Sequence, residues 1–415
     1  MNVVKVASIV SIHYAGDRPS SLNKSRGFLP SIKIWVIIKD CIYSKKYPLS
    51  QHREGKARFE IGEAFYRQTS QVGRDLAVLA ARLEKSDRGS LRVLDSMAGC
   101  GVRSLRYYLE AEADWIWANE GNPDIKAVLR HNLKPLFDAG RVQLTHSDAN
   151  RVFFDCYARR DYYDLVDVDS FGSPVPFLNT SLWATRLGGF VYLTSTDGRT
   201  ATGHAGDQSL RVYAARTRAH PSAHEQGLRL IIGAAQQQAA TKGLGVEPVF
   251  SLFSGSVYRV MLRLVKRQRL NSQNYGFLGY CHGCGEYRTL SWNDFGRVSP
   301  CPQDGTPWVV SGPMWLGALH DRVYLQRMRS IAQSWEWTKR VKLLEIMEEE
   351  AELPPYFYKL GVLGKRFNGD IPPRDELIQR LRQCGYRTGR THLESQAIKT
   401  EASLETCVSV MGGGA

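Results

Sequence analysis

Short apolar runs and stretches with helical spacing of apolar residues alternate along residues 59–266. The apolar runs have the length of strands and lie at 91–94, 115–118, 142–145, 165–168, 189–196 and 257–265. The helical spacing lies between them, at 76–83, 104–110 and 124–133. Strands that alternate with helices are typical of a mostly parallel sheet with helices on both faces. The pattern therefore predicts an α/β, doubly wound, Rossmann-like domain over residues 59–266.

The amino-acid composition and the pattern of apolar residues change on each side of this domain. Residues 1–58 are rich in Ser and basic residues, a composition like that of an organelle transit peptide, and are expected to form an N-terminal extension. Residues 267–402 combine irregular, cysteine-bearing sequence with two helical stretches at 321–351 and 373–384, which indicates a smaller α+β C-terminal domain. Residues 403–415, with consecutive glycines near the end, are expected to be a frayed tail.

Charge and cysteine usage narrow the class of protein. Lys and Arg number 55 against 41 Asp and Glu, a formal net charge of +14. This excess favours a polyanionic partner, because released counterions drive binding to phosphate backbones. The 8 cysteines do not form the pattern of a disulfide framework, which favours a reducing compartment. The apolar run at 32–38 is interrupted by Lys33 and too short to cross a bilayer, so no membrane association is predicted.

Carboxylates follow three successive predicted strands. The first strand runs into a turn that contains Asp95, Gly99 and Gly101, the second ends at Glu120, and the third ends at Asp148 and Ala149. The glycines let a ligand approach the backbone, a carboxylate after the second strand can accept both ribose hydroxyls, and Asp148 can hold an adenine amino group. Because no pyrophosphate-binding loop follows, the pattern predicts S-adenosylmethionine as cofactor. A domain that binds NAD, or one that has lost its ligand, is the alternative.

The fourth strand ends at Asp169-Ser170-Phe171-Gly172, where the glycine and a nearby proline cannot continue it. Methylation of an exocyclic amine needs an acceptor for its N–H bonds, so that the nitrogen lone pair points at the methyl group, and a platform that holds the base flat. We assign the acceptor and general base to Asp169 and the stacking ring to Phe171. An ordinary strand-to-turn junction is the alternative.

Several separated segments, in the same order, carry a family resemblance between residues 59 and 402. They are Gly-Val-Arg at 101–103, Asp-Ser-Phe-Gly-Ser-Pro at 169–174, Glu-Pro at 247–248, Tyr-Arg-Val at 258–260, Gly-Pro-Met-Trp-Leu-Gly at 312–317, Arg-Thr-His at 390–392 and Ile-Lys-Thr at 398–400. With these segments the chain resembles the tRNA (guanine-26 N2)-dimethyltransferases. The resemblance implies a class I methyltransferase domain, N2-methylation and then dimethylation of guanine-26, and tRNA as partner, while no protein partner is implied.

The same resemblance implies roles for single residues. Arg74, together with the acidic motifs and Asp148, is expected to line the S-adenosylmethionine pocket, and Asp169 and Phe171 are expected to hold the guanine. Ser170 stands where the family usually has proline, which loosens the backbone after Asp169. Arg67-Gln68 stands where Asn-Pro is frequent, as in a plant or cyanobacterial-like branch.

Four residues of the C-terminal domain are candidate metal ligands. Cys281-x-x-Cys284 and Cys301 resemble a zinc ribbon whose fourth cysteine is replaced by Asp304. A carboxylate oxygen binds zinc, although thiolates are preferred. A relic site held by packing alone is the alternative to a structural zinc.

Basic residues interleaved with aromatic ones mark the C-terminal domain as the predicted grip on tRNA. They include Arg322, Arg327, Arg329, Arg340, Arg374, Arg380, Arg382, Arg387 and Arg390. For any single one of them, a solvated helix face balanced by the acids at 345–350 is the alternative. Two rival functions stay open: an RNA-binding protein with an impaired methyltransferase fold, and a small-molecule methyltransferase. The location is expected to be a plastid or mitochondrion, with the nucleus as alternative.

Overall fold

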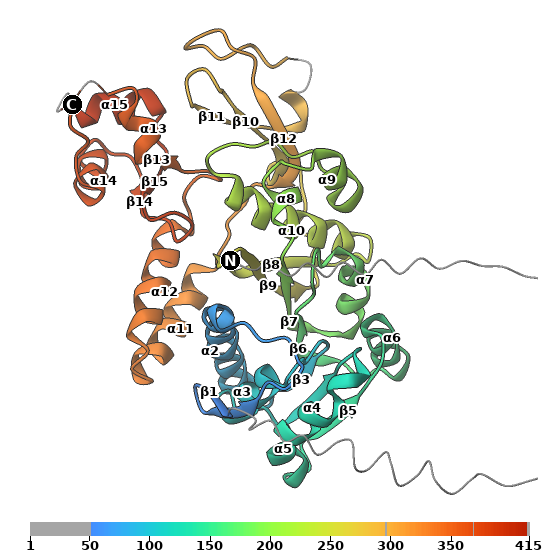
Figure 1. Cartoon of the computed structure of the whole chain (residues 1–415). Helices are drawn as coiled ribbons and strands as arrows, with labels where there is room; N and C mark the ends of the chain where they lie inside the picture. Colours follow the sequence, from blue (N-terminus) through green and yellow to red (C-terminus); the bar gives the residue numbers. More distant parts are fainter. Residues whose placement is uncertain (1–50, 295–296, 368, 413–415) are drawn as a thin grey trace, which may run out of the picture. The chain divides into compact units, whose positions relative to one another are not determined.

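A seven-stranded sheet lies at the centre of the computed structural model, which describes residues 51–294, 297–367 and 369–412 (Figure 1). The strand order is β5-β4-β3-β6-β7-β9-β8. The strands are β3 (Arg92–Asp95), β4 (Trp115–Asn119), β5 (Val142–Thr145), β6 (Tyr163–Val168), β7 (Thr185–Ser195), β8 (Gly245–Ser254) and β9 (Val257–Val265). Strands β5, β4, β3, β6 and β7 pair with their neighbours in parallel. At the other edge, β9 pairs antiparallel with β7, and β8 pairs antiparallel with β9. The predicted Rossmann-like, mostly parallel sheet is confirmed.

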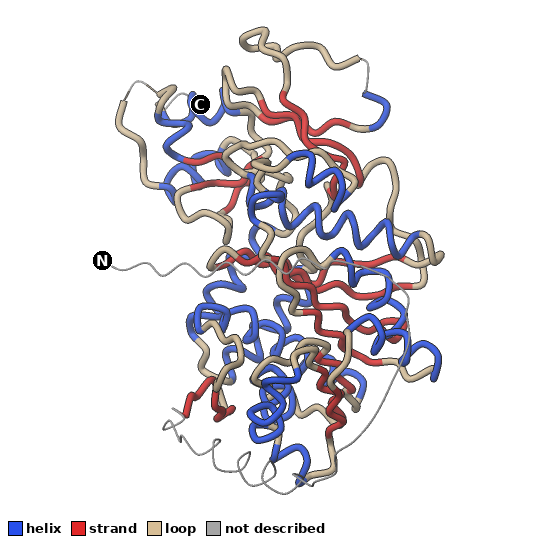
Figure 2. Tube along the Cα trace, turned by 45° about the vertical axis from the view of Figure 1, so that its right-hand side comes forward, coloured by secondary structure: helices blue, strands red, loops and turns tan. Residues whose placement is uncertain are grey.

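Helices cover both faces of this sheet (Figure 2). Alternate strand residues point to opposite faces, so Val93 and Leu165 enter one hydrophobic cluster while Leu94 and Val166 enter the other. The helices of the first cluster include α2 (Gln71–Arg88), α3 (Val102–Leu109), α4 (Lys126–Asn132) and α5 (Lys134–Asp138). Those of the second include α6 (Ala149–Arg159), α7 (Val175–Ala184), α8 (Gly198–Ala201), α9 (Gly206–Tyr213) and α10 (Ala223–Ala240). No helix in the described ranges is both long and apolar enough to cross a bilayer.

A hairpin precedes the helices and spans the boundary predicted at residue 59. It consists of β1 (Gln51–Glu54) and β2 (Ala57–Glu60), paired antiparallel. Glu54 is buried and contacts Arg74 of α2 and Arg106 of α3, and Phe59 belongs to the first cluster. The hairpin therefore packs with the sheet domain, while the rest of the predicted extension, residues 1–50, lies outside the described residues.

The C-terminal part contains two small sheets and five helices in the described ranges. One sheet has the order β11-β10-β12 and the other β13-β15-β14. Their strands are β10 (Tyr275–Tyr280), β11 (Tyr287–Leu290), β12 (Val309–Trp315), β13 (Tyr358–Lys359), β14 (Thr388–Gly389) and β15 (Ala397–Thr400). The helices are α11 (Arg322–Ser334), α12 (Thr338–Glu350), α13 (Leu360–Gly364), α14 (Arg374–Gln383) and α15 (Leu404–Met411). The predicted smaller α+β domain is confirmed.

Two details of this part differ from the expectation. The stretch 321–351 forms two helices, because Glu336 adopts a left-handed conformation with φ 57° between α11 and α12. The expected frayed tail is a helix up to Met411: Leu404, Cys407 and Val410 repeat at three-residue intervals, and all three are buried.

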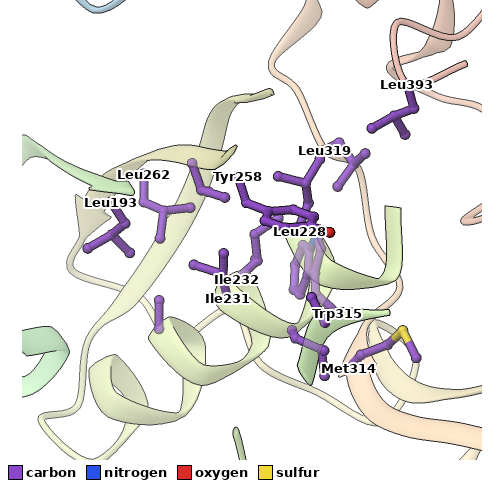
Figure 3. Packing of buried hydrophobic residues seen from close by; sticks show 14 of the residues in the cluster. Leu193, Leu228, Ile231, Ile232, Tyr258, Leu262, Met314, Trp315, Leu319 and Leu393 are labelled. Carbon is purple, nitrogen blue, oxygen red and sulfur yellow. The ribbon is translucent and has the colours of Figure 1, made fainter. Parts of the chain in front are cut away.

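Helix α10 joins the two parts through one continuous core (Figure 3). Ile231 and Ile232 of α10 lie beside Leu193 and Leu262 of the large sheet, and Leu228 lies towards β12. The cluster continues into the C-terminal part through Met314, Trp315, Leu319 and Leu393. The sheet domain and the C-terminal part therefore share one hydrophobic core. The cavity described next lies at the carboxyl ends of the parallel strands.

Candidate active site

A cavity of about 570 Å³ lies at the carboxyl ends of β3 to β6. Loops that leave neighbouring parallel strands meet at this edge, so residues distant in sequence come together there. Most of the predicted site residues line the cavity, namely Arg74, Gly99, Glu120, Asp148, Ala149, Asp169 and Phe171. Its volume is in the range of small-molecule and cofactor sites.

Asp95 and Gly101 are the two predicted cofactor residues that do not line the cavity. Asp95 is fully buried and accepts a hydrogen bond from Ser104 Oγ at 2.7 Å. Burial, and then the neighbouring charge of Asp167, raise the pKa of Asp95 to about 7. Gly101 precedes α3 with φ 84°, and a Cβ there would lie 2.8 Å from Leu129 Cδ1. Both residues lie next to the glycine turn, where they shape its backbone.

The three loops on the cofactor side are tied to one another by side chains. The backbone N–H groups of Gly99 and Asn122 each donate to one oxygen of Glu120, both at 2.8 Å. Asn119 Nδ2 donates to Ser96 O at 3.1 Å and to Ser147 O at 2.9 Å. The carboxylates of Glu120 and Asp148 both line the cavity beside the backbone of these turns. This is where the ribose and adenine contacts of S-adenosylmethionine are predicted, so the residues fit that ligand. Sequence reasoning missed Asn119, whose signal is a polar residue at the very end of a buried strand.

Arg74 is held rigidly at the cavity wall. Its Nε and Nη2 donate to the two oxygens of Glu54 at 2.7 and 2.5 Å. Tyr66 Oη also donates to Glu54, at 2.9 Å. Burial raises the pKa of Glu54, but the contacts with Arg74 and the charge of Arg106 outweigh burial and lower it overall. The carboxylate is therefore ionised and fixes the Arg74 guanidinium.

Asp169 lies at the end of β6 in contact with a buried cation, Arg103 of α3. Arg103 bridges two carboxylates, with Nη1 2.9 Å from Asp167 and Nη2 2.9 Å from Asp169. Burial raises the pKa of Asp169, but the charges of Arg103 and Arg259 outweigh it and hold that pKa below the usual range. Asp169 is therefore ionised at neutral pH and can accept N–H groups. Sequence reasoning did not assign Arg103 a role at the site, although it closes the Gly-x-Arg motif.

Ser170 takes the place of the family's usual proline without leaving the segment loose. Its side chain is buried, and Oγ donates to Thr194 O of β7 at 3.1 Å. The next turn is also tied to β7, since the N–H of Gly172 donates to Thr196 Oγ1 at 2.8 Å. These bonds anchor the backbone that presents Asp169 and Phe171.

Two exposed aromatic rings stand together at the cavity. Phe171 is 71 % exposed and Phe65 is 59 % exposed. Their ring centroids lie 4.9 Å apart at an interplanar angle of 73°. Single exposed apolar side chains are common on protein surfaces, but here two exposed rings touch each other at the edge of a cavity. The pair is therefore suited to contact a flat base. Sequence reasoning identified Phe171 and missed Phe65, which belongs to a polar loop and carries no periodic signal.

The four predicted metal ligands are gathered at one point. The ligand atoms of Cys281, Cys284, Cys301 and Asp304 all lie within 4.8 Å of one another. Tetrahedral zinc with Zn–S bonds of about 2.3 Å requires sulfur atoms roughly 3.8 Å apart, and the Sγ atoms of Cys284 and Cys301 are separated by 3.4 Å. The N–H of Cys284 points at Cys281 Sγ at 3.3 Å, which favours a thiolate. The set fits a structural zinc, and His282 is not part of it.

A second cluster with metal-ligand residue types, His320, Glu350 and His392, is held together by contacts of both imidazoles with Glu350, of which the one from His320 Nε2 is a 3.4 Å ion-pair contact without a hydrogen bond. The backbone N–H groups of Ser251 and Phe253 in edge strand β8 donate to His320 Nδ1 at 3.2 Å and His392 Nε2 at 3.4 Å. Each imidazole thus carries its proton on the nitrogen that faces Glu350, where a metal would need a lone pair. The cluster therefore connects the sheet edge to the C-terminal part.

Most of the arginines predicted to grip tRNA are paired with carboxylates. The pairs are Arg327–Asp87, Arg329–Glu348, Arg340–Asp75, Arg374–Asp375, Arg380–Glu376, Arg382–Glu349, Arg387–Glu401 and Arg390–Asp375. Arg327 and Arg340 join α11 and α12 to helix α2. Much of this positive charge is therefore balanced by carboxylates, as the alternative of a balanced surface expects, although only Glu348 and Glu349 among these partners belong to the acids at 345–350.

Comparisons with known proteins agree with this geometry. Residues 50–412 match the family model described as N2,N2-dimethylguanosine tRNA methyltransferase. A tRNA (guanine(26)-N(2))-dimethyltransferase of Thermococcus kodakarensis is 29 % identical over 387 residues, covering 86 % of this chain and 98 % of that protein. Its Pyrococcus abyssi counterpart is 29 % identical over 386 residues, covering 86 % and 97 %.

A solved structure gives the same result for the fold. The structure of Trm1 from Pyrococcus horikoshii with S-adenosyl-L-methionine superposes with a TM-score of 0.76 at 27 % identity, covering 88 % of this chain and 100 % of that one. The family model spans nearly all of the described residues, including the cavity and the C-terminal part. The chain belongs to the N2,N2-dimethylguanosine tRNA methyltransferase family.

Proposed function

We propose that the protein transfers methyl groups from S-adenosylmethionine to N2 of guanine-26 in tRNA, once to give the monomethyl and again to give the dimethyl base. The observation that carries the proposal is the cavity in which an ionised Asp169 and two exposed rings face the turn at Gly99. The named archaeal relatives, which the chain covers almost completely, are tRNA (guanine(26)-N(2))-dimethyltransferases.

The residues of the chain divide the work between cofactor and base. Bound S-adenosylmethionine supplies an electrophilic methyl group on a sulfonium that is a good leaving group. Glu120 and Asp148 bind the nucleoside end, and Arg74 contributes a fixed positive charge. Asp169 accepts an N2–H of guanine, which turns the nitrogen lone pair away from the carboxylate, and proximity and alignment supply most of the acceleration.

The lowered pKa of Asp169 is compatible with its role as base. Once N2 carries a new methyl group it is positively charged and strongly acidic, so a weak base such as an aspartate suffices to take the proton. An aspartate whose pKa is below the usual range also stays ionised, and therefore accepts hydrogen bonds, over the whole neutral range.

Phe65 and Phe171 define how the base is held. Guanine-26 lies in a structured region of tRNA, so the base must leave its stack to reach a cavity of this kind. The two exposed rings replace the lost stacking with contacts on the base. Ser170 is no obstacle to activity in this arrangement, because its hydroxyl anchors the motif to β7.

We infer that tRNA approaches over basic residues outside the ion-paired C-terminal network. Exposed arginines with no carboxylate within ion-pair distance among the described residues lie on segment 196–220, which begins at the cavity residue Thr196. They are Arg199, Arg211, Arg216 and Arg218. Unpaired exposed guanidinium groups are the ones available to phosphates. Substituting these four by Gln should weaken tRNA binding and lower its salt dependence, and an unchanged affinity would contradict the inference.

We propose a structural zinc held by Cys281, Cys284, Cys301 and Asp304. The convergence of the four ligand atoms supports it. Burial raises the pKa of the Cys284 thiol to about 12, and a bound cation reverses this by stabilising the thiolate.

The direct test of the proposed function is incorporation of labelled methyl groups into unmodified tRNA. Wild-type protein should transfer label, and Asp169→Ala should reduce the rate by about 10²- to 10⁴-fold while leaving tRNA binding intact. Tight RNA binding without label in the wild type would support the rival, an RNA-binding protein with an impaired methyltransferase fold. Label in small molecules alone would support the small-molecule rival.

We further propose that the chain belongs to a plant- or cyanobacterial-like branch and works in a plastid or mitochondrion. Support comes from Arg67-Gln68 in place of Asn-Pro and from the composition of residues 1–58. Fusing residues 1–58 to a fluorescent reporter tests the location, and a nuclear signal would favour the alternative.

A further inference from the structure

Arg259 of β9 is a buried cation on the wall of the active-site cavity. Its residue surface is only 1 % exposed, and it is among the residues that line the cavity. Among the described residues, neither its Nε nor its Nη1 has a hydrogen-bond partner. Burying a charged group without hydrogen bonds is unfavourable, so these two donors need a purpose that the fold itself does not supply.

The fold holds Arg259 in this position from two sides. A Cβ on Gly73 of α2 would lie 2.4 Å from Arg259 Cδ and 2.5 Å from its Nε, so only glycine leaves room for the side chain there. The nearby Tyr192 hydroxyl donates to Gly73 O at 2.9 Å and is therefore committed elsewhere. The guanidinium is thus fixed by packing, while its donors remain free for a ligand in the cavity.

The sheet order indicates which ligand these donors meet. The predicted cofactor residues follow β3, β4 and β5, and Asp169 follows β6. Strand β9 lies on the opposite side of β6, beyond β7 (Figure 1), and the strand register pairs Arg259 with Thr194 of β7. Arg259 therefore borders the half of the cavity that receives the base, next to the carboxylate that accepts its amino group.

We propose that Arg259 recognises the O6 atom of the target guanine, an inference that rests on the proposed function. Guanine presents its N2–H and N1–H donors beside the O6 acceptor on one edge. Asp169 accepts from the donors, and one of the two free N–H donors of Arg259 donates to O6, an atom to which arginine donates readily in guanine recognition. Adenine places an amino group where O6 would be, and that group meets the fixed cation of Arg259. The pair Asp169 and Arg259 thus selects guanine before the methyl group is transferred.

The test removes each partner of the proposed contact separately. Full-length wild-type protein and Arg259→Met are compared on tRNA transcripts with guanine or 2-aminopurine at the target position, in single turnovers with saturating S-adenosylmethionine. 2-Aminopurine keeps the 2-amino group and lacks both O6 and the N1 proton; loss of the N1–H contact with Asp169 affects the wild type and the variant alike, so the comparison is between their ratios on the two bases. We expect Arg259→Met to lose about 10- to 100-fold on guanine and to lose little on 2-aminopurine, because the two changes remove the same contact.

Control variants separate this role from structural damage. Arg263→Met removes a cation four residues along the same strand that pairs with Glu84 and does not line the cavity, so base discrimination should not change. If Arg259→Met fails to fold, Arg259→Lys keeps a charge but loses the fixed planar donor, and it should show a smaller loss confined to guanine.

Three results would overturn the inference. The first is an equal loss of rate on both bases. The second is a raised KM for S-adenosylmethionine with unchanged base discrimination, which would assign Arg259 to the methionine carboxylate. The third is a loss of rate that disappears at high pH, which would mean that Arg259 acts only through Asp169. Failure of the proposed function is distinct, since the wild type would then not methylate the guanine transcript at all.

Discussion

Replacing Arg103 by Met should change both the stability of the protein and the pH dependence of its activity. The side chain is 3 % exposed and lies 2.9 Å from both Asp167 and Asp169. Methionine has a comparable aliphatic stem but no charge, so the substitution removes the cation and leaves both carboxylates in place. The two carboxylates differ in burial, and the two effects follow from that difference.

The stability effect comes from Asp167, which is completely buried. Breaking a buried ion pair on one side costs about 3–5 kcal/mol. Burial raises the pKa of Asp167 even with Arg103 present, and without Arg103 it rises further. A carboxyl whose folded pKa is above its unfolded pKa contributes stability at low pH that is lost as pH rises. The deficit of Arg103→Met in urea unfolding should therefore grow as the pH rises above about 4, the ordinary pKa of an aspartate in the unfolded chain.

The activity effect comes from Asp169, which is 33 % exposed. A neighbouring arginine lowers the pKa of an aspartate by about one to three units. Its removal should shift the acid limb of the single-turnover rate upwards by about one to three pH units, with activity present above the limb and lost as pH falls. Arg259 remains and keeps the shift towards the lower end of this range.

A matched control lies one turn further along α3. Arg106 is fully buried and paired with Glu54, Asp75 and Glu110, and none of these contacts involves Asp169. Arg106→Met should therefore destabilise the protein without moving the acid limb. If Arg103→Met folds poorly, Arg103→Met combined with Asp167→Asn removes the orphaned charge. An unchanged acid limb in the Arg103 variants, or an equal shift in Arg106→Met, would refute the electrostatic role given to Arg103.

Three further predictions concern other parts of the molecule. Phe65→Ala and Phe171→Ala should each lower kcat/KM for tRNA by about 5- to 150-fold with unchanged S-adenosylmethionine binding. Because the rings touch, the double variant should lose less than the product of the two single losses, and steady-state kinetics that match the wild type would contradict the proposed contact of both rings with the base. Cys301→Ser should lower zinc content from about one per chain and reduce Tm, whereas metal analysis that finds no zinc in normally folded wild-type protein would remove the metal site. Burial lowers the pKa of His320 from 6.5 to about 4, so as the pH falls the unfolded chain takes up a proton before the folded chain does, and the free energy of unfolding should decrease by up to about 3 kcal/mol between pH 6.5 and 4. Urea unfolding of His320→Gln should lack this decrease, and pH curves identical to those of the wild type would contradict the role of His320.

The fold could be predicted from sequence where period and burial agree. Strands β5 and β9 match the expected residues at both ends, because their apolar runs are bounded by turn residues. Strand β8 was not predicted, since Pro248 interrupts an edge strand whose register shifts at that point. The residues of the sheet β11-β10-β12 carry no strand pattern in the sequence, because its strands contain several glycines and its pairing is made by distant residues. Local pattern cannot reveal such pairing.

The candidate site could be predicted where it follows strand ends, and less well where it depends on burial. Glu120, Asp148 and Asp169 follow from position alone, since parallel strands end at one edge. Arg103 and Arg259 could not be identified as buried cations, because arginine is usually exposed and only tertiary packing places these two inside.

We expect a guanine amino group, and no other atom of tRNA, to receive the methyl group. This expectation is tested most directly by digesting transcripts after reaction with labelled S-adenosylmethionine and identifying the labelled nucleosides by mass spectrometry, with guanine or adenine at position 26. The expected result is N2-methylguanosine that converts to N2,N2-dimethylguanosine with time, and loss of the label when adenine replaces the guanine. Label in a different nucleoside, or label that persists in the adenine transcript, would contradict it.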